Sequence, residues 1–394
     1  MGSQRRQALL GLLCFGLITV SAAGASDIDG LVRDNSACAF SLYHKLDHSK
    51  GNILISPYGI SSALAMTYAA ARENTASQMA GALRFTLDQK MLPLAFSKLT
   101  SELDGAVEEH NQQLCIANGL CVTGGSLDTS FTALLKRYYD AEIFHGNLDV
   151  INAWVKNKTK GNIETILEQL AANTVCVLLN AVYFKGIWET PFKKELTREM
   201  DFIVSPRKRA AADFMYRKSK VSLFVGNDFQ ALSLPYAGNR LSMIVVLPNA
   251  ADGLPVLEKR IDADAIAQWL EKMSMREVSV FLPKFKFQTA YDLIPYFKEL
   301  GMTDAFVGGV ADFRGMGFKK GDLWISQIMH KAAIVVDEEG TVAAAATAVA
   351  VARHGAAFNV LTFKADHPFL FVIRDNVTGT ILFLGRVADP AAGN

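Results

Sequence analysis

The sequence predicts a mixed α+β fold built as one large domain. Helix-like apolar spacing dominates the first part of the chain, and strand-like segments dominate the part that follows. Residues 175–184 form an almost continuous apolar run, which is typical of a central strand buried on both faces of a sheet. No repeat, low-complexity block or long Pro/Gly/Ser linker divides the 394 residues, so we expect a single core.

The N-terminus has the pattern of a secretory signal peptide. Arg5 and Arg6 precede an apolar run at residues 8–20, and small residues suited to cleavage follow. The run is too short for a stable membrane anchor. We therefore expect a signal peptide at residues 1–25, a mature domain at 26–394, an extracellular location and no membrane partner.

In the first part, residues 28–46 carry apolar side chains at helical spacing. A short apolar strand at residues 52–55 leads to Ser56-Pro57, where serine at the cap and proline at the first helical position begin a helix. Thr75 and Gln78 have the spacing of a capping box and predict another helix start at Thr75. Further helices are expected at residues 89–103, 128–139 and 150–159, and a strand at 114–122.

The second part is crowded with expected strands. A helix at residues 291–300 is predicted to end at Gly301. The last two strands are joined by an Asn-Val-Thr-Gly turn. Besides residues 175–184, the expected strands are 201–204, 221–225, 231–234, 241–247, 278–287, 369–374 and 380–387.

The balance of charge bears on the class of partner. Lys and Arg number 40 against 39 Asp and Glu, so bulk charge gives no support for a nucleic-acid partner. Small basic groups at residues 207–209 and at 217, 218 and 220 are interpreted as solvated surface. A polyanion such as heparin is the alternative partner for them.

The cysteines and the sequons are interpreted for a chain that enters the secretory pathway. Of the five cysteines, one lies in the signal peptide; the others are Cys38, Cys115, Cys121 and Cys176, which we expect to be free buried thiols. No cysteine or histidine spacing suggests a metal site. Asn157 and Asn376 begin sequons that a secreted protein could use for glycosylation.

Motifs for catalysis and for cofactors are missing from the sequence. There is no nucleophile elbow, zinc-protease helix, phosphate-binding loop or dinucleotide fingerprint. The seven histidines are scattered, and His330 is interpreted as a buried core histidine. We therefore expect no cofactor, no metal and no enzymatic activity.

The least ordinary stretch lies at residues 338–355. Glu338, Glu339 and Gly340 precede residues 341–352, all of which are Ala, Val or Thr, and Arg353, His354 and Gly355 follow. Small residues on both alternating faces suit a strand that inserts into a crowded sheet. An Ala-rich helix or linker has the same composition, so the composition leaves both interpretations open.

Several motifs follow one another along the chain. They are Asn52-Ile53-Leu54-Ile55-Ser56-Pro57, Asn180-Ala181-Val182-Tyr183-Phe184-Lys185-Gly186-Ile187-Trp188, Leu282-Pro283-Lys284-Phe285, Glu338-Glu339-Gly340-Thr341 and Phe383-Leu384-Gly385-Arg386-Val387. In this order they resemble the serpin family of serine protease inhibitors, from about residue 28 to the C-terminus, and most of all its secreted arthropod members. The resemblance implies three β-sheets, eight to nine helices and an exposed reactive-centre loop at about residues 338–360. It also implies a monomer that inhibits a serine endopeptidase: the protease attacks the loop, and the cleaved loop inserts into the main sheet before the acyl-enzyme hydrolyses.

The resemblance also assigns roles to residues. Ser56, Asn180 and His330 match the polar cluster beneath the point where the sheet opens. Lys284 and Glu338 match a salt bridge near the insertion point, with Trp188 beside it. The hinge comprises Glu338, Glu339, Gly340, Thr341, Ala343, Ala345 and Thr347.

The position of the cleaved bond stays open. In the spacing usual for the family, Gly340 is the fifteenth residue before the cleaved bond, which places that bond at His354-Gly355. A loop that is shorter by one residue places the bond at Arg353-His354. We favour Arg353 and a trypsin-like target, because trypsin-like pockets carry a buried carboxylate and few proteases prefer histidine. The alternatives are a non-inhibitory carrier or chaperone and an inhibitor of a cysteine protease.

Overall fold

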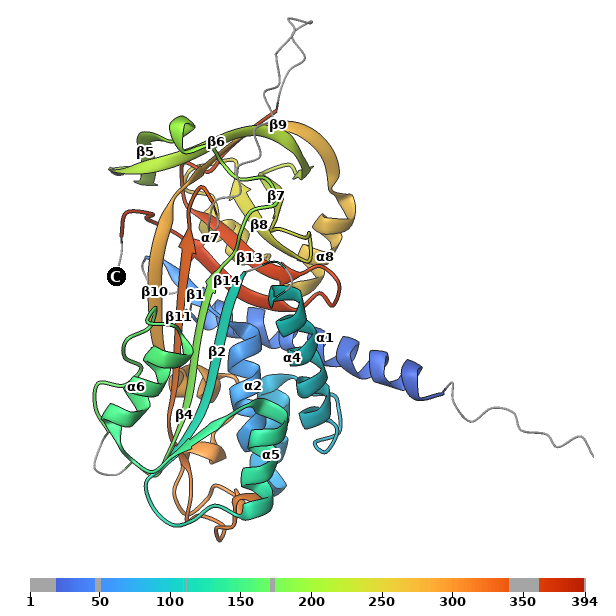
Figure 1. Ribbon diagram of the computed structural model, residues 1–394, viewed down its shortest axis with the longest axis vertical. Helices are drawn as coiled ribbons and strands as arrows, with labels where there is room; N and C mark the ends of the chain where they lie inside the picture. The colour runs from blue at the N-terminus through green and yellow to red at the C-terminus, as the bar shows by residue number, and fades with distance from the viewer. Residues whose placement is uncertain are drawn as a thin grey trace, which may run out of the picture.

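The structure is a computed structural model that describes residues 19–46, 51–108, 110, 112–170, 174–339 and 361–392. A five-stranded sheet runs along the molecule, and part of a nine-stranded sheet lies above it in the view of Figure 1. The fold is mixed α+β, as expected. The described residues form these α-helices: α1 (Thr19–Leu46), α2 (Pro57–Tyr68), α3 (Glu73–Leu83), α4 (Leu92–Glu108), α5 (Thr129–Tyr139), α6 (Leu148–Lys158), α7 (Leu254–Glu258), α8 (Ala263–Lys272) and α9 (Ile294–Glu299).

The five-stranded sheet carries the candidate site. Its order is β10-β11-β4-β2-β3. In that order the strands are Phe285–Asp292, Ile325–Val336, Cys176–Lys185, Gln113–Val122 and Glu142–Phe144. The predicted central strand is therefore β4, the third of the five.

Strand β4 is buried on both faces, and its alternating residues enter two separate cores. Leu178 and Val182 pack in the large core on the side of α2. Leu179 and Ala181 pack in a smaller core with Ile151 of α6. The sheet is thus covered by α2 on one face and by α6 on the other (Figure 1).

The nine-stranded sheet is held together by β6, which is 18 residues long. Three sheets were expected, whereas the described strands form two hydrogen-bonded sheets, because β6 pairs with β5, β7 and β9 in one continuous sheet. The strands of the nine-stranded sheet are β1 (Ile53–Ile55), β5 (Arg198–Ser205), β6 (Lys208–Val225), β7 (Phe229–Pro235), β8 (Leu241–Pro248), β9 (Ser274–Pro283), β12 (Leu361–Lys364), β13 (Phe369–Asp375) and β14 (Ile381–Val387).

Two sequence predictions of local structure are wrong. The expected strand at residues 278–287 is two strands, since β9 ends at Pro283 and β10 begins at Phe285 in the other sheet. Helix α3 begins at Glu73, two residues before the predicted start. The Thr75 hydroxyl caps no helix; its oxygen accepts a hydrogen bond from the backbone N–H of Asp312 at 3.0 Å.

Cys38, Cys115, Cys121 and Cys176 are free and buried, as predicted. Burial raises the pKa of the Cys38 thiol to about 12, which leaves it unreactive. None of the helices described is both long and apolar enough to cross a membrane. The described residues also contain no cluster of His, Cys, Asp and Glu able to hold a metal ion.

Candidate functional site

The candidate site is a seam between β11 and β4. These two strands pair in parallel, with Ile328 opposite Leu178 and Ile334 opposite Phe184. Their outer neighbours, β10 and β2, pair with them antiparallel. A strand running opposite to both could separate β11 from β4 and pair antiparallel with each.

A row of buried polar side chains crosses this seam at mid-height. His330, Asn180 and Asn118 lie opposite one another on β11, β4 and β2. His330 Nδ1 lies 2.7 Å from Asn180 Oδ1, and Asn180 Nδ2 donates to Asn118 Oδ1 at 2.8 Å. The Ser56 backbone N–H donates to His330 Nε2 at 3.1 Å, and Asn118 Nδ2 donates to the Ser62 hydroxyl at 3.2 Å. The row therefore ties the start of α2 to three strands.

The expected cluster of Ser56, Asn180 and His330 comes together in the structure. Its hydrogen bonds assign the proton of His330 to Nδ1, because Nε2 accepts from a backbone N–H. Burial lowers the pKa of His330 to about 3, so the ring is neutral at ordinary pH. A strand that entered the seam would have to break the hydrogen bond between His330 and Asn180.

Sequence reasoning missed Asn118 and Ser62. Asn118 is the one polar side chain within the predicted apolar strand 114–122, and that was the only sign of its role. Its position opposite Asn180 depends on the register between β2 and β4, which a single sequence does not reveal.

Glu338 lies just beyond β11, where the described chain approaches the loop. Its side chain is 6% exposed, and its carboxylate contacts Lys284 Nζ at 3.1 Å. The Thr197 hydroxyl donates to the same carboxylate at 2.8 Å. Burial acts to raise the pKa of Glu338, but hydrogen bonds from its own backbone N–H, Thr197 and Lys284 outweigh it and lower that pKa overall. The expected salt bridge between Lys284 and Glu338 is therefore present.

Trp188 fixes the same segment through the backbone. Its indole Nε1 donates to the Asp337 carbonyl at 2.8 Å, and its backbone N–H donates to the Glu339 carbonyl at 3.3 Å. The ring is stacked on Tyr236 with 4.5 Å between centroids. Sequence reasoning placed Trp188 near the insertion point, and the structure adds Tyr236 as the surface that holds it.

Three further contacts hold residues 337–339 in place, and none of them was predicted from the sequence. The Phe192 backbone N–H donates to the Glu338 carbonyl at 2.9 Å. Lys185 pairs with Asp337 at 3.3 Å, and Lys194 pairs with Glu339. The start of the expected hinge is thus held by the end of β4 and by the segment that follows β4, through side chains and backbone together.

The remaining loop predictions lie outside the described residues. They concern Gly340, Thr341, Ala343, Ala345, Thr347, Arg353, His354 and Gly355. The described chain resumes at Leu361, where β12 pairs with β9 in the nine-stranded sheet. Residues 340–360 therefore connect the end of a strand in one sheet with the start of a strand in the other.

The two sequons differ in their surroundings. Asn157 is exposed on the last turn of α6. Asn376 is also exposed, but its amide donates to the Asn239 carbonyl at 2.9 Å and accepts from the Ser242 hydroxyl at 2.7 Å. The Asn376 amide is thus engaged within the protein, and glycosylation stays a prediction at both sequons.

Comparison with known proteins gives a consistent result. The family model described as "Serpin (serine protease inhibitor)" matches residues 33–390. Serpin B6 of Pongo abelii is 38% identical over 385 residues, which cover 92% of this chain and 100% of the relative. The leukocyte elastase inhibitor of Xenopus tropicalis is 37% identical over 384 residues, covering 90% and 99% of the two chains.

A solved structure supports the same assignment. The native state of the thermophilic serpin tengpin is similar with a TM-score of 0.83 and 30% identity, covering 91% of this chain and 94% of tengpin. The family is one of protease inhibitors and not of enzymes, in agreement with the missing catalytic motifs. The chain belongs to the serpin family.

Proposed function

We propose that this chain is a secreted inhibitor of a trypsin-like serine endopeptidase. It acts as a suicide substrate, and its cleaved loop inserts between β11 and β4. One observation carries the proposal: two parallel strands meet at the seam, and the loop of small residues begins at the end of one of them. A segment that turns back from β11 runs antiparallel to both strands.

Insertion is favourable for a chain of this composition. Each backbone hydrogen bond gained along the two strands contributes about 1 kcal/mol net. Residues 341–352 are all Ala, Val or Thr, which enter a close-packed sheet without large volume or charge. A charged side chain on the inward face would cost several kcal/mol unless it found a partner.

The chemistry of trapping belongs to the protease. Its serine Oγ attacks the carbonyl carbon of Arg353, the Arg353–His354 peptide bond breaks, and the new amine of His354 leaves with a proton. An ester then joins Arg353 to the protease. If insertion is faster than the attack of water on this ester, the protease is carried along the sheet and remains bound. The inhibitor supplies no catalytic residue.

Arg353 accounts for the choice of a trypsin-like target. It is the sole Lys or Arg in residues 340–360. A guanidinium makes charge-assisted, often bidentate bonds with the carboxylate of such a pocket. Removing one partner of a desolvated pair costs about 2–5 kcal/mol, or roughly 30-fold to several thousand-fold in rate.

The test is to incubate the mature protein with trypsin-like, chymotrypsin-like, elastase-like and cysteine proteases. We expect a denaturant-stable complex with a trypsin-like enzyme and a released peptide that begins at His354. Arg353→Ala should almost abolish association, whereas the neighbouring control His354→Ala should change it only a few-fold.

Other outcomes discriminate among the alternatives. A peptide that begins at Gly355 would move the cleaved bond to His354-Gly355. A complex with the elastase-like or the cysteine protease alone would contradict the trypsin-like target. Cleavage by every enzyme without any complex would contradict inhibition and favour a carrier or chaperone.

A further inference from the structure

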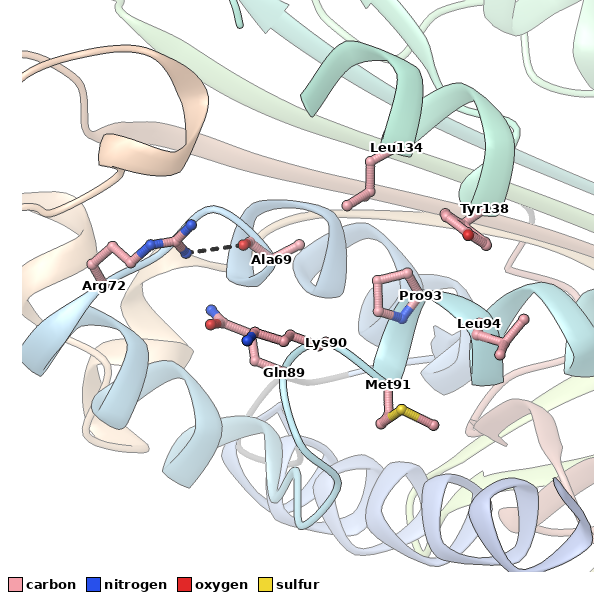
Figure 2. A pocket seen from close by; sticks show the side chains of 9 residues that line it. All are labelled: Ala69, Arg72, Gln89, Lys90, Met91, Pro93, Leu94, Leu134 and Tyr138. Carbon is pink, nitrogen blue, oxygen red and sulfur yellow. Dashed lines mark hydrogen bonds between the residues drawn. The ribbon is translucent and has the colours of Figure 1, made fainter. Parts of the chain in front are cut away.

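A pocket lies at the opposite end of α2 from the polar row. Its volume is about 540 Å³, which is within the range typical of small-molecule sites. Figure 2 shows that its side chains come from the end of α2 and the segment after it, the start of α4 with the residues before it, and α5. None of these residues belongs to the seam or to the hinge.

One half of the pocket is apolar. Met91 and Leu94 are large apolar side chains that are 42% and 41% exposed, in contrast to the buried residues of the core. Leu134 and Tyr138 of α5 face them from the other side in Figure 2. Exposed apolar side chains that converge on one cavity are typical of a ligand site.

The other half of the pocket is cationic. Arg72 and Lys90 line it. The guanidinium of Arg72 donates from Nη1 to the carbonyls of Ala69 and Ala71, at 3.1 and 2.8 Å. It therefore covers carbonyls after α2 that would otherwise repel an anion.

The pocket is organised before any ligand arrives. Gln89 donates from Nε2 to the carbonyls of Tyr68 and Ala71, which fixes the segment before α4 against the end of α2. The first turn of α4, with its partial positive charge, carries Leu94 on the pocket wall. The cations and the apolar wall are thus held at opposite ends of one cavity (Figure 2).

We propose that this pocket binds an amphipathic organic anion, a carboxylate with an unbranched apolar tail. The carboxylate lies between Arg72 and Lys90, and the tail lies along Met91, Leu94 and Leu134. Apolar contacts hold the tail, and charge-assisted hydrogen bonds select the head group. A sulfated sugar would satisfy the cations but would leave the apolar wall uncovered.

The probe is decanoate, titrated into the full mature protein by calorimetry below the concentration at which it forms micelles. We expect saturable binding, with decanol binding at least about tenfold more weakly because it lacks the charge. Acetate should not bind measurably, because it has no tail to cover the apolar wall.

Variants separate the two halves of the pocket. Lys90→Ala should weaken decanoate binding by about threefold to tenfold. Leu94→Asp should weaken it by more than about tenfold, because it places a negative charge on the apolar wall. An aspartate in the first turn of α4 suits the helix, so the fold should survive, which a melting curve checks. Lys98→Ala, an exposed lysine of α4 that does not line the pocket, is the matched control and should bind decanoate normally.

Four results would overturn the proposal. The first is the absence of saturable decanoate binding. The second is equal affinity for decanoate and decanol. The third is an equal loss of affinity in Lys90→Ala and Lys98→Ala. The fourth is displacement of decanoate by a heparin disaccharide at a lower concentration than by octanoate, which would assign the cations to a sulfated sugar.

Discussion

His330 makes the seam sensitive to acid. Burial lowers its pKa from 6.5 to about 3, so between these values the unfolded chain binds more protons than the folded one. This difference in bound protons makes stability rise with pH across that window and fall as the solution is acidified. The contribution changes by up to about 1.4 kcal/mol per pH unit.

Substitution of His330 should therefore flatten the dependence of stability on pH. We expect denaturant midpoints measured at about pH 7 and about pH 5 to differ less in His330→Gln than in the wild type. His145 is exposed, and His145→Gln is the control that should keep the full difference. An unchanged pH dependence in His330→Gln would contradict the assignment of a neutral, buried ring.

The salt bridge of Glu338 should stabilise the start of the hinge. In Lys284→Ala the buried carboxylate keeps the Thr197 hydroxyl but loses its cation, so we expect a loss of about 1–2 kcal/mol in unfolding free energy. Lys286→Ala, an exposed neighbour on β10, should stay within about 0.5 kcal/mol. Equal denaturant midpoints for the two variants would show that the bridge contributes nothing.

At the scale of elements, insertion depends on how side chains alternate between the two faces of the inserted segment. Successive residues of a strand point to opposite faces, so Thr341, Ala343, Ala345 and Thr347 share one face and Val342 lies on the other. If the face of Thr341 points inward, Thr341→Arg should slow insertion until hydrolysis of the ester wins, which converts the inhibitor into a substrate.

The matched control is Val342→Arg, which carries the same charge on the outward face and should still trap the protease. Gels run under denaturing conditions measure the ratio of trapped complex to cleaved inhibitor for both variants. Equal ratios would remove the inward face of the hinge from the mechanism.

For the molecule as a whole, the apolar periodicity of the sequence predicted those helices and strands that depend on local sequence pattern. The almost continuous apolar run became the central strand β4, and Ser56-Pro57 begins α2, with the Ser56 hydroxyl accepting from the Gly59 N–H at 3.3 Å. The salt bridge between Lys284 and Glu338 was predicted from the family resemblance and not from periodicity.

What the sequence could not reveal depends on contacts distant along the chain. The break at Pro283 separates strands of different sheets, and nothing in the apolar alternation marks that change. Asn118 enters the polar row only through the register of β2 with β4. Thr75 had the spacing of a cap, but a distant backbone N–H competes for its hydroxyl.

The proposed inhibition requires that the seam between β11 and β4 accept the cleaved loop as a new strand. β11 and β4 pair directly with each other, so a favourable later insertion between them implies a native state maintained by a kinetic barrier and not by the lowest free energy. The direct measurement is a thermal melting curve before and after the loop is cut between Ala348 and Ala352. The added hydrogen bonds and burial should raise the midpoint by tens of degrees, because roughly 1 kcal/mol moves a large domain by about 2–4 °C. A midpoint that stays unchanged after complete cleavage would contradict insertion.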